Sequence, residues 1–194
     1  MQTKGRDLKV YIKNMVCDRC KLVIGNVVEQ LGLSPAVIDL GLLEFANDLT
    51  DQQLQDLQQQ IEPLGFALVN DKKTQLIESI KSEIIRLVHN EQALEKIKLS
   101  DYLKKRLHHD YNYLSNLFSS VEGTTIEHYH IKQKIERAKE LLVYDELTLT
   151  QIADQLGYSS VAHLSSQFKK VTGLTPTHFK RLKDAKHRQP LDKV

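Results

Sequence analysis

Residues 148–176 read TLTQIADQLGYSSVAHLSSQFKKVTGLTP and have the pattern of two short helices joined by a tight turn. Thr148 opens a Thr-x-x-Gln capping box, which predicts the start of the first helix. Gly157 supplies the left-handed backbone conformation that a sharp turn requires. Gly173 is expected to end the second helix, and Pro176 is expected to begin a third at its first position. A helix pair at this spacing predicts a helix-turn-helix motif of the kind that enters the major groove of DNA.

The second helix of this pair has an apolar face and a polar face. Val161, Leu164, Phe168 and Val171 recur at helical spacing and are expected to point inward. The opposite face carries groups that can donate to or accept from base edges, or contact phosphates. We predict that the DNA-binding residues of this pair are Ser160, His163, Ser166, Gln167, Lys169 and Lys170. For any one of them the alternative is an ordinary solvated helix position.

A similar pattern occurs fifty residues earlier, in Ser100–Leu107 followed by Tyr111–Val121, with Phe118 in the place of Phe168. The predicted DNA-binding residues of this first pair are Asn112, Ser115 and Asn116. Asparagine can pair bidentately with adenine. Because this face has no arginine or lysine, we expect it to read DNA weakly or through shape.

A long helix is predicted between the two pairs. Thr124 and Glu127 suggest a capping box at its start, and its apolar positions continue to about Tyr144. At about 1.5 Å per residue its length is nearly 30 Å. Two helix pairs held that far apart can enter major-groove segments about 34–36 Å apart on one face of the duplex.

These motifs resemble the AraC/XylS family of bacterial transcription regulators. The resemblance rests on a signature formed here by Ile152, Ala153, Gly157, Tyr158, Ser160, Phe168, Lys169, Gly173, Thr175 and Pro176. It implies an all-α domain over residues 71–194, with two helix-turn-helix units joined by a long helix, that binds double-stranded DNA.

The first 70 residues have a different pattern, strand-helix-strand-strand-helix-strand. Leu8 to Lys13 alternates apolar and polar residues, short apolar runs flank Gly41, and Thr50 opens another capping box. This order predicts an α+β domain of the ferredoxin-like βαββαβ type over residues 1–70.

Two cysteines, Cys17 and Cys20, form a C-x-x-C motif between the first strand and the first helix of this domain. The segment Asn14–Cys20 resembles the metal-binding loop of heavy-metal-associated domains, although Asn14 replaces the usual glycine. Asparagine tolerates unusual backbone angles better than most residues. The resemblance implies that Cys17 and Cys20 bind Cu(I) or another thiophilic ion. Inert cysteines and a dithiol redox switch are the alternatives, and Met15 is expected to pack in the core.

Composition and charge favour a soluble protein that binds a polyanion. Residues 1–71 carry six basic and ten acidic side chains, whereas residues 72–194 carry 21 basic and 15 acidic, a net charge of +6. Without a secretory-type N-terminus or a long apolar run, we expect a cytoplasmic protein that contacts no membrane. No catalytic motif appears in the sequence, so we do not expect an enzyme.

The combined prediction is a sequence-specific transcription regulator whose small N-terminal domain responds to a thiophilic metal ion or to redox state. RNA polymerase and a metal-donor protein are further candidate partners. The alternative is a Cu(I)-trafficking protein with an accessory DNA-binding domain, and a dithiol oxidoreductase is a weaker third.

Overall fold

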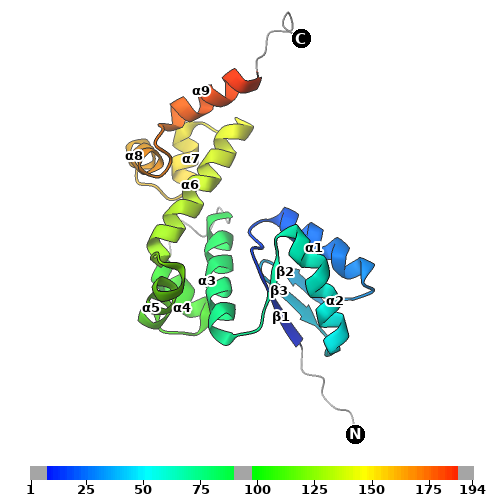
Figure 1. Ribbon diagram of the computed structural model, residues 1–194. Coiled ribbons are helices and arrows are strands. Elements are labelled where there is room, and N and C mark those ends of the chain that lie inside the picture. The colour runs from blue at the N-terminus through cyan, green and yellow to red at the C-terminus, as the bar shows by residue number, and fades with distance from the viewer. Residues whose placement is uncertain (1–7, 90–97, 188–194) are drawn as a thin grey trace, which may run out of the picture. The chain divides into compact units, whose positions relative to one another are not determined.

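The computed structural model describes residues 8–89 and 98–187 (Figure 1). By its contacts the chain divides into two compact units, Met1–Ile85 and Arg86–Val194. The dividing point lies inside one helix, α3 (Lys72–His89). The functional boundary expected after residue 70 stays a prediction.

The first unit contains a four-stranded antiparallel sheet in the order β2-β3-β1-β4. Its strands are β1 (Leu8–Lys13), β2 (Val37–Asp39), β3 (Leu42–Phe45) and β4 (Ala67–Val69). In the central pairings Val10 lies opposite Leu43 and Ile12 opposite Leu68. The alternation along β1 puts Val10 and Ile12 inside and leaves Lys9 and Lys13 exposed, which sets the buried face of the sheet.

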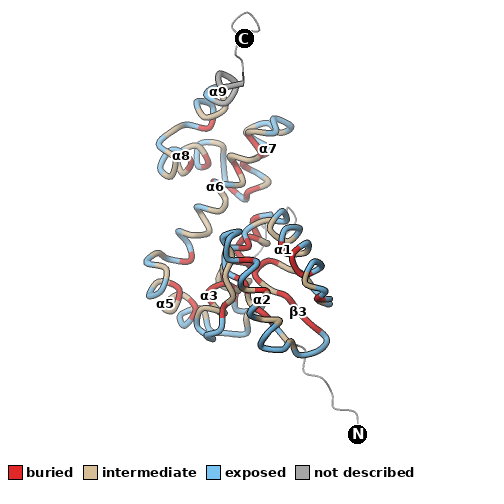
Figure 2. The backbone as a smooth tube through the Cα atoms, turned by 45° about the vertical axis from the view of Figure 1, so that its right-hand side comes forward, coloured by how far each residue is buried: buried red, intermediate tan, exposed pale blue. Residues whose placement is uncertain are grey.

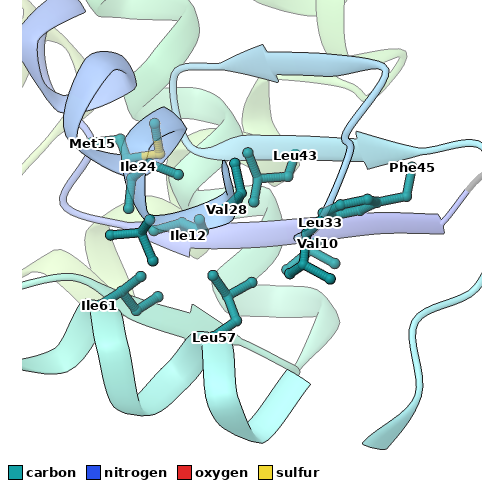
Figure 3. Packing of buried hydrophobic residues seen from close by; sticks show 11 residues of the cluster. Val10, Ile12, Met15, Ile24, Val28, Leu33, Leu43, Phe45, Leu57 and Ile61 are labelled. Carbon is teal, nitrogen blue, oxygen red and sulfur yellow. The ribbon is translucent and has the colours of Figure 1, made fainter. Parts of the chain in front are cut away.

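Two helices, α1 (Asp18–Gln30) and α2 (Asp51–Ile61), pack on that face, and a short 3-10 turn, η1 (Glu62–Leu64), follows α2. Their chain order with the strands is β1-α1-β2-β3-α2-β4. Figure 3 shows Ile24 and Val28 of α1 and Leu57 and Ile61 of α2 meeting the strand residues. Met15 is 3% exposed and belongs to this core, so the prediction that it packs rather than protrudes is confirmed.

The second unit is helical throughout the residues that the structure describes. Its elements are the end of α3, then α4 (Leu99–Leu107), α5 (Tyr111–Glu122), α6 (Ile126–Tyr144), α7 (Leu149–Gln155), α8 (Val161–Thr172) and α9 (Pro176–His187). Helices α4 and α5 lie together at one end of α6, and α7, α8 and α9 gather at the other (Figure 1). A core around α6 unites Ile135, Ala138 and Leu142 with Ile152, Leu164 and Phe168.

The two ends of this unit repeat the same local structure fifty residues apart. Gly123 and Gly173 end α5 and α8 with positive φ angles of 64° and 79°. Each is followed within two residues by a threonine cap. An edge-to-face ring contact at 5.6 Å joins the two helices on either side of each glycine, Phe118 of α5 with Tyr129 of α6 and Phe168 of α8 with Phe179 of α9. The internal similarity of the sequence therefore corresponds to a repeated packing arrangement.

The start of α6 differs from the prediction by one residue. Thr125, not Thr124, is the cap, and its hydroxyl accepts a hydrogen bond from the backbone N–H of His128 at 3.1 Å. Thr175 makes the equivalent bond to His178 at 3.2 Å. The two helices begin at equivalent positions of the repeat. Ile126 is the first residue of α6 and is fully buried, and Pro176, fifty residues later, is the first residue of α9. Burial of Ile126 fixes the helix start one residue later than the Thr-x-x-Glu pattern suggests.

No helix among the described residues combines the length and the apolar character needed to cross a membrane.

Candidate nucleic-acid interface and thiol pair

Local hydrogen bonds hold the segment that leads from α7 into α8. Thr148 and Gln151 form the predicted capping box of α7. Gly157 takes a positive φ of 64° at the turn. Ser160 then caps α8, because its hydroxyl accepts from the backbone N–H of His163 at 3.1 Å. These contacts fix where the first turn of α8 begins and which residues it presents.

The predicted residues of α8 lie at the surface. His163, Ser166, Lys169 and Lys170 are exposed and Gln167 is half-buried, while Leu164 and Phe168 are fully buried on the opposite face. Figure 2 colours the backbone of α8 by this burial. Ser160 is also exposed, although its oxygen is engaged in the cap. The outward set therefore forms one continuous polar face, with its two lysines in the last turn.

Tyr158, in the turn before α8, lies beneath this face. It is 6% exposed, and its hydroxyl donates a hydrogen bond to Oε1 of Gln167 at 3.0 Å. Its ring meets the ring of His163 edge to face, with centroids 5.2 Å apart. Burial raises the pKa of Tyr158 to about 12, so the hydroxyl keeps its proton at neutral pH. The sequence marked Tyr158 only as part of a signature and gave no sign of these contacts.

Lys134, on α6, lies over Tyr158. Its Nζ atom is 4.1 Å from the centroid of the Tyr158 ring, within the range of a cation–π interaction. Burial lowers the pKa of Lys134 to about 8. One turn earlier on α6, burial and the nearby Lys134 charge lower the pKa of His130 to about 4. His130 is therefore neutral at pH 7, and its Nε2 atom has no hydrogen-bond partner among the described residues.

The exposed face of α5 is less polar. Of the residues predicted to contact DNA, Asn112 and Asn116 are exposed and Ser115 is half-buried. Tyr113 is 50% exposed and stands fifty residues before His163, the same offset as the paired phenylalanines. Tyr113 is not among the residues predicted from the sequence, although this offset of fifty residues points to it. Its ring lies 5.5 Å from that of His109.

The turn before α5 uses a residue other than glycine. His108 has a positive φ of 56°, close to the 64° of Gly157. Histidine adopts this conformation more readily than most residues with a side chain. Asp110 then caps α5 by accepting from the backbone N–H of Asn112 at 2.8 Å. The two turns thus serve the same purpose with different residues.

The thiols of Cys17 and Cys20 lie together at the start of α1. Their sulfur atoms are 3.4 Å apart, and both residues are half-buried. Burial is the main reason why the pKa of the Cys17 thiol is raised, with its neighbour Cys20 contributing in both directions. Across residues 8–89 and 98–187, no cluster of three or more His, Cys, Asp or Glu side chains is placed to hold a metal. A soft ion with two sulfur ligands fits this pair better than a closed four-ligand zinc site.

A model of the helix-turn-helix domain matches residues 103–182, from α4 into α9. This part of the chain is similar to a helix-turn-helix domain. The matched residues hold the second half of α4 and all of α5, α6, α7 and α8, and they exclude the sheet and the cysteine pair.

Two curated proteins are similar to more than half of the chain. Over 115 residues it is 29% identical to the uncharacterized HTH-type transcriptional regulator YtdP of Bacillus subtilis, covering 59% of this chain and 15% of YtdP. Over 105 residues it is 30% identical to the uncharacterized transcriptional regulatory protein YesN of the same organism, covering 53% of this chain and 28% of YesN. The chain thus spans less than a third of the length of either relative.

Among solved structures, the chain is similar to the C-terminal domain of the two-component response regulator yesN from Fusobacterium nucleatum. The similarity has a TM-score of 0.46 at 29% sequence identity and covers 57% of this chain and 99% of that one.

Proposed function

We propose that this chain is a sequence-specific DNA-binding transcription regulator that reads double-stranded DNA with the exposed face of α8. The observation that carries the proposal is the continuous polar face of α8 inside a segment that matches a helix-turn-helix domain. Relatives similar to more than half of the chain bear the names of transcriptional regulators. Side chains of the His163, Ser166 and Gln167 type read base edges in the major groove.

Two units of helix-turn-helix type, α4–α5 and α7–α8, share the recognition. Helix α6 separates them with 19 residues, a length of about 28 Å at 1.5 Å per residue. In this arrangement α5 contacts a second groove segment with Asn112, Ser115, Asn116 and Tyr113. Because the described face of α5 lacks lysine and arginine, α8 supplies most of the specificity.

Charge supports binding to a polyanion. Lys169 and Lys170 are exposed on the last turn of α8, where they can contact phosphates beside the groove. Contacts of this kind release counterions, so the affinity must fall with salt concentration.

The test is selection of DNA sites from a random pool by the full-length chain, followed by gel-shift titration at several salt concentrations. A defined sequence should be enriched, and the selected site should bind at least about a thousandfold more tightly than random DNA. Replacing His163 and Ser166 by alanine should abolish this preference, whereas replacing Gln59 and Gln60, exposed residues of α2, should leave it unchanged. Equal affinity for selected and random DNA would refute the proposal.

For the N-terminal unit, the proposed role is an input domain of the ferredoxin-like, heavy-metal-associated type. Its element order and its half-buried thiol pair support this role. Cys17 and Cys20 would hold a thiophilic ion, with Cu(I) the best fit to two sulfur ligands. The bound ion would supply a cross-link between the β1–α1 loop and the first turn of α1. A metal-donor protein and RNA polymerase would be the further partners of such a regulator.

Metal input is tested separately from DNA binding. The full-length chain should bind one equivalent of Cu(I), and the paired substitutions Cys17→Ser and Cys20→Ser should remove that binding. The same variant should still select DNA, because both cysteines lie outside the matched segment. Site selection with and without Cu(I) or Zn(II) then measures whether metal binding changes DNA binding. An ion alters DNA affinity only if it binds the DNA-competent and the DNA-incompetent forms of the chain with different affinities. Cu(I) binding that survives the double substitution would contradict the assignment of the site.

A further inference from the structure

Tyr158 lies under the polar face of α8 and contacts two of its residues, His163 and Gln167. Both its backbone and its ring are held by contacts. The backbone N–H of Tyr158 donates to the carbonyl of Ala153 at 2.8 Å, and its ring packs in the core of the second unit. A hydroxyl on so constrained a ring has a well-defined position relative to α8.

We propose that Tyr158 is a positioning residue for base recognition: its hydroxyl holds the carbonyl oxygen of Gln167, so that the amide NH2 is the group offered to DNA. This proposal rests on the proposed DNA-binding function of α8. The contact that supports it is the 3.0 Å hydrogen bond from the Tyr158 hydroxyl to Oε1 of Gln167.

Lys134 favours this direction of the hydrogen bond. An ammonium group 4.1 Å from the ring centroid draws electron density out of the ring. The phenolic hydroxyl consequently becomes a stronger donor and a weaker acceptor. A strong donor pairs with the carbonyl end of an amide, which leaves the NH2 end of Gln167 free.

The orientation of the amide decides which bases Gln167 can read. A glutamine that turns freely offers a donor or an acceptor and can pair bidentately with adenine. With its oxygen engaged by Tyr158, Gln167 offers a donor, which suits acceptors in the major groove: guanine N7 and O6, thymine O4 and adenine N7. Cytosine presents a donor, its N4 amino group, and is disfavoured.

The experiment uses the full-length chain and its selected DNA site, with all four base pairs tested at each position. Gln167→Ala first identifies the base pair that depends on this side chain. At that position Tyr158→Phe, which keeps the ring and removes the hydroxyl, should reduce discrimination against cytosine roughly three- to tenfold, the usual effect of one hydrogen bond. Affinity for random DNA and the circular dichroism spectrum should not change.

Two further variants sharpen the test. Tyr158→Phe combined with Gln167→Ala should discriminate no less than Gln167→Ala alone, because the hydroxyl acts only through Gln167. Gln167→Glu keeps an oxygen for Tyr158 and presents an acceptor outward, so the preference should move to cytosine. Tyr144→Phe is the matched control, because Tyr144 is 61% exposed at the end of α6 and lies outside the proposed contacts, and it should leave that base pair unaffected.

The outcomes separate the two proposals. If the unaltered chain selects no sequence, the DNA-binding function itself is wrong. If it selects a site but Tyr158→Phe discriminates as well as the parent, or Gln167→Ala and Gln167→Glu shift no base preference, then the role of Tyr158 is overturned and α8 still binds DNA.

Discussion

The side-chain amide of Asn14 donates a hydrogen bond to the carbonyl oxygen of Gly65 at 2.9 Å, across 51 residues of sequence. Both residues have positive φ angles, 73° for Asn14 and 85° for Gly65. The bond ties the loop that precedes Cys17 to the turn that follows α2. Asn14 therefore does more than tolerate the backbone conformation that glycine would adopt: it adds a connection that glycine could not make.

Asn14→Ala should lower the free energy of unfolding by about 1–2 kcal/mol, because alanine loses the bond and is strained at positive φ. Asn14→Gly removes the bond but relieves the backbone, so its effect should stay within about 1 kcal/mol. Urea unfolding followed by circular dichroism measures both. An alanine variant as stable as the glycine variant would show that φ is unimportant at this position.

His130 should make stability depend on pH. Its pKa is about 4 in the folded chain and 6.5 for a free side chain, so the unfolded state binds more protons between those values. Stability is complete above pH 6.5 and falls as the pH drops toward 4. Between pH 7 and pH 5 the loss attributable to this group should be about 2 kcal/mol. Lys134, with its pKa near 8, stays charged throughout this window.

The control for His130 is glutamine, which is polar and does not titrate. The difference between the two proteins in unfolding free energy, measured in urea at pH 7 and pH 5, isolates the contribution of His130. Equal pH dependence in the parent and in His130→Gln would place the titrating group elsewhere.

Adjacent threonines at the start of α6 offer a matched pair. Thr125→Ala should cost about 1 kcal/mol of stability because the N-cap is lost. Thr124→Ala should change stability by less than about 0.5 kcal/mol, since Thr124 is not the cap. Thermal and urea unfolding of the two variants will distinguish them, and a larger effect at Thr124 would restore the start suggested by the sequence.

Lysines on α8 and α6 should differ in their effect on DNA binding. Lys170 is exposed, so Lys170→Gln should weaken binding to all sequences and reduce the salt slope by about 1. Lys134 is half-buried against Tyr158, so Lys134→Met should leave the salt slope unchanged. Gel-shift titrations between low and moderate salt measure both slopes, and a reduced slope in Lys134→Met would mean that its charge reaches the phosphates.

Features set by neighbouring residues were predictable from the sequence. Thr148 and Gln151 lie one helical turn apart, and the capping box they suggested is confirmed. The same holds for Thr50 and Gln53 at the start of α2. In each case the pattern and the physical interaction involve the same few residues.

Features that depend on packing between distant elements were not predictable from local patterns. Lys134 and Tyr158 belong to different helical segments, and only the packing of α6 against the α7–α8 turn places one over the other. Thr124 was a locally reasonable cap that gave way to Thr125, because burial of Ile126 determines the helix start. The exposure of His163 and Ser166 could be anticipated, whereas the contact of Gln167 with Tyr158 could not.

Helix α6 runs without a break from Ile126 to Tyr144. The number of residues in α6 therefore sets the rotation of α8 relative to α5 about the helix axis as well as the distance between them. In the proposed complex with DNA, one inserted residue would advance the far end by about 1.5 Å and rotate it by about 100°, turning α8 away from the side of the duplex that α5 would face. Four inserted residues would nearly restore the rotation. Within this architecture, evolution can therefore respace the two half-sites in steps close to one helical turn, and single-residue changes in length should be the ones that natural variants avoid.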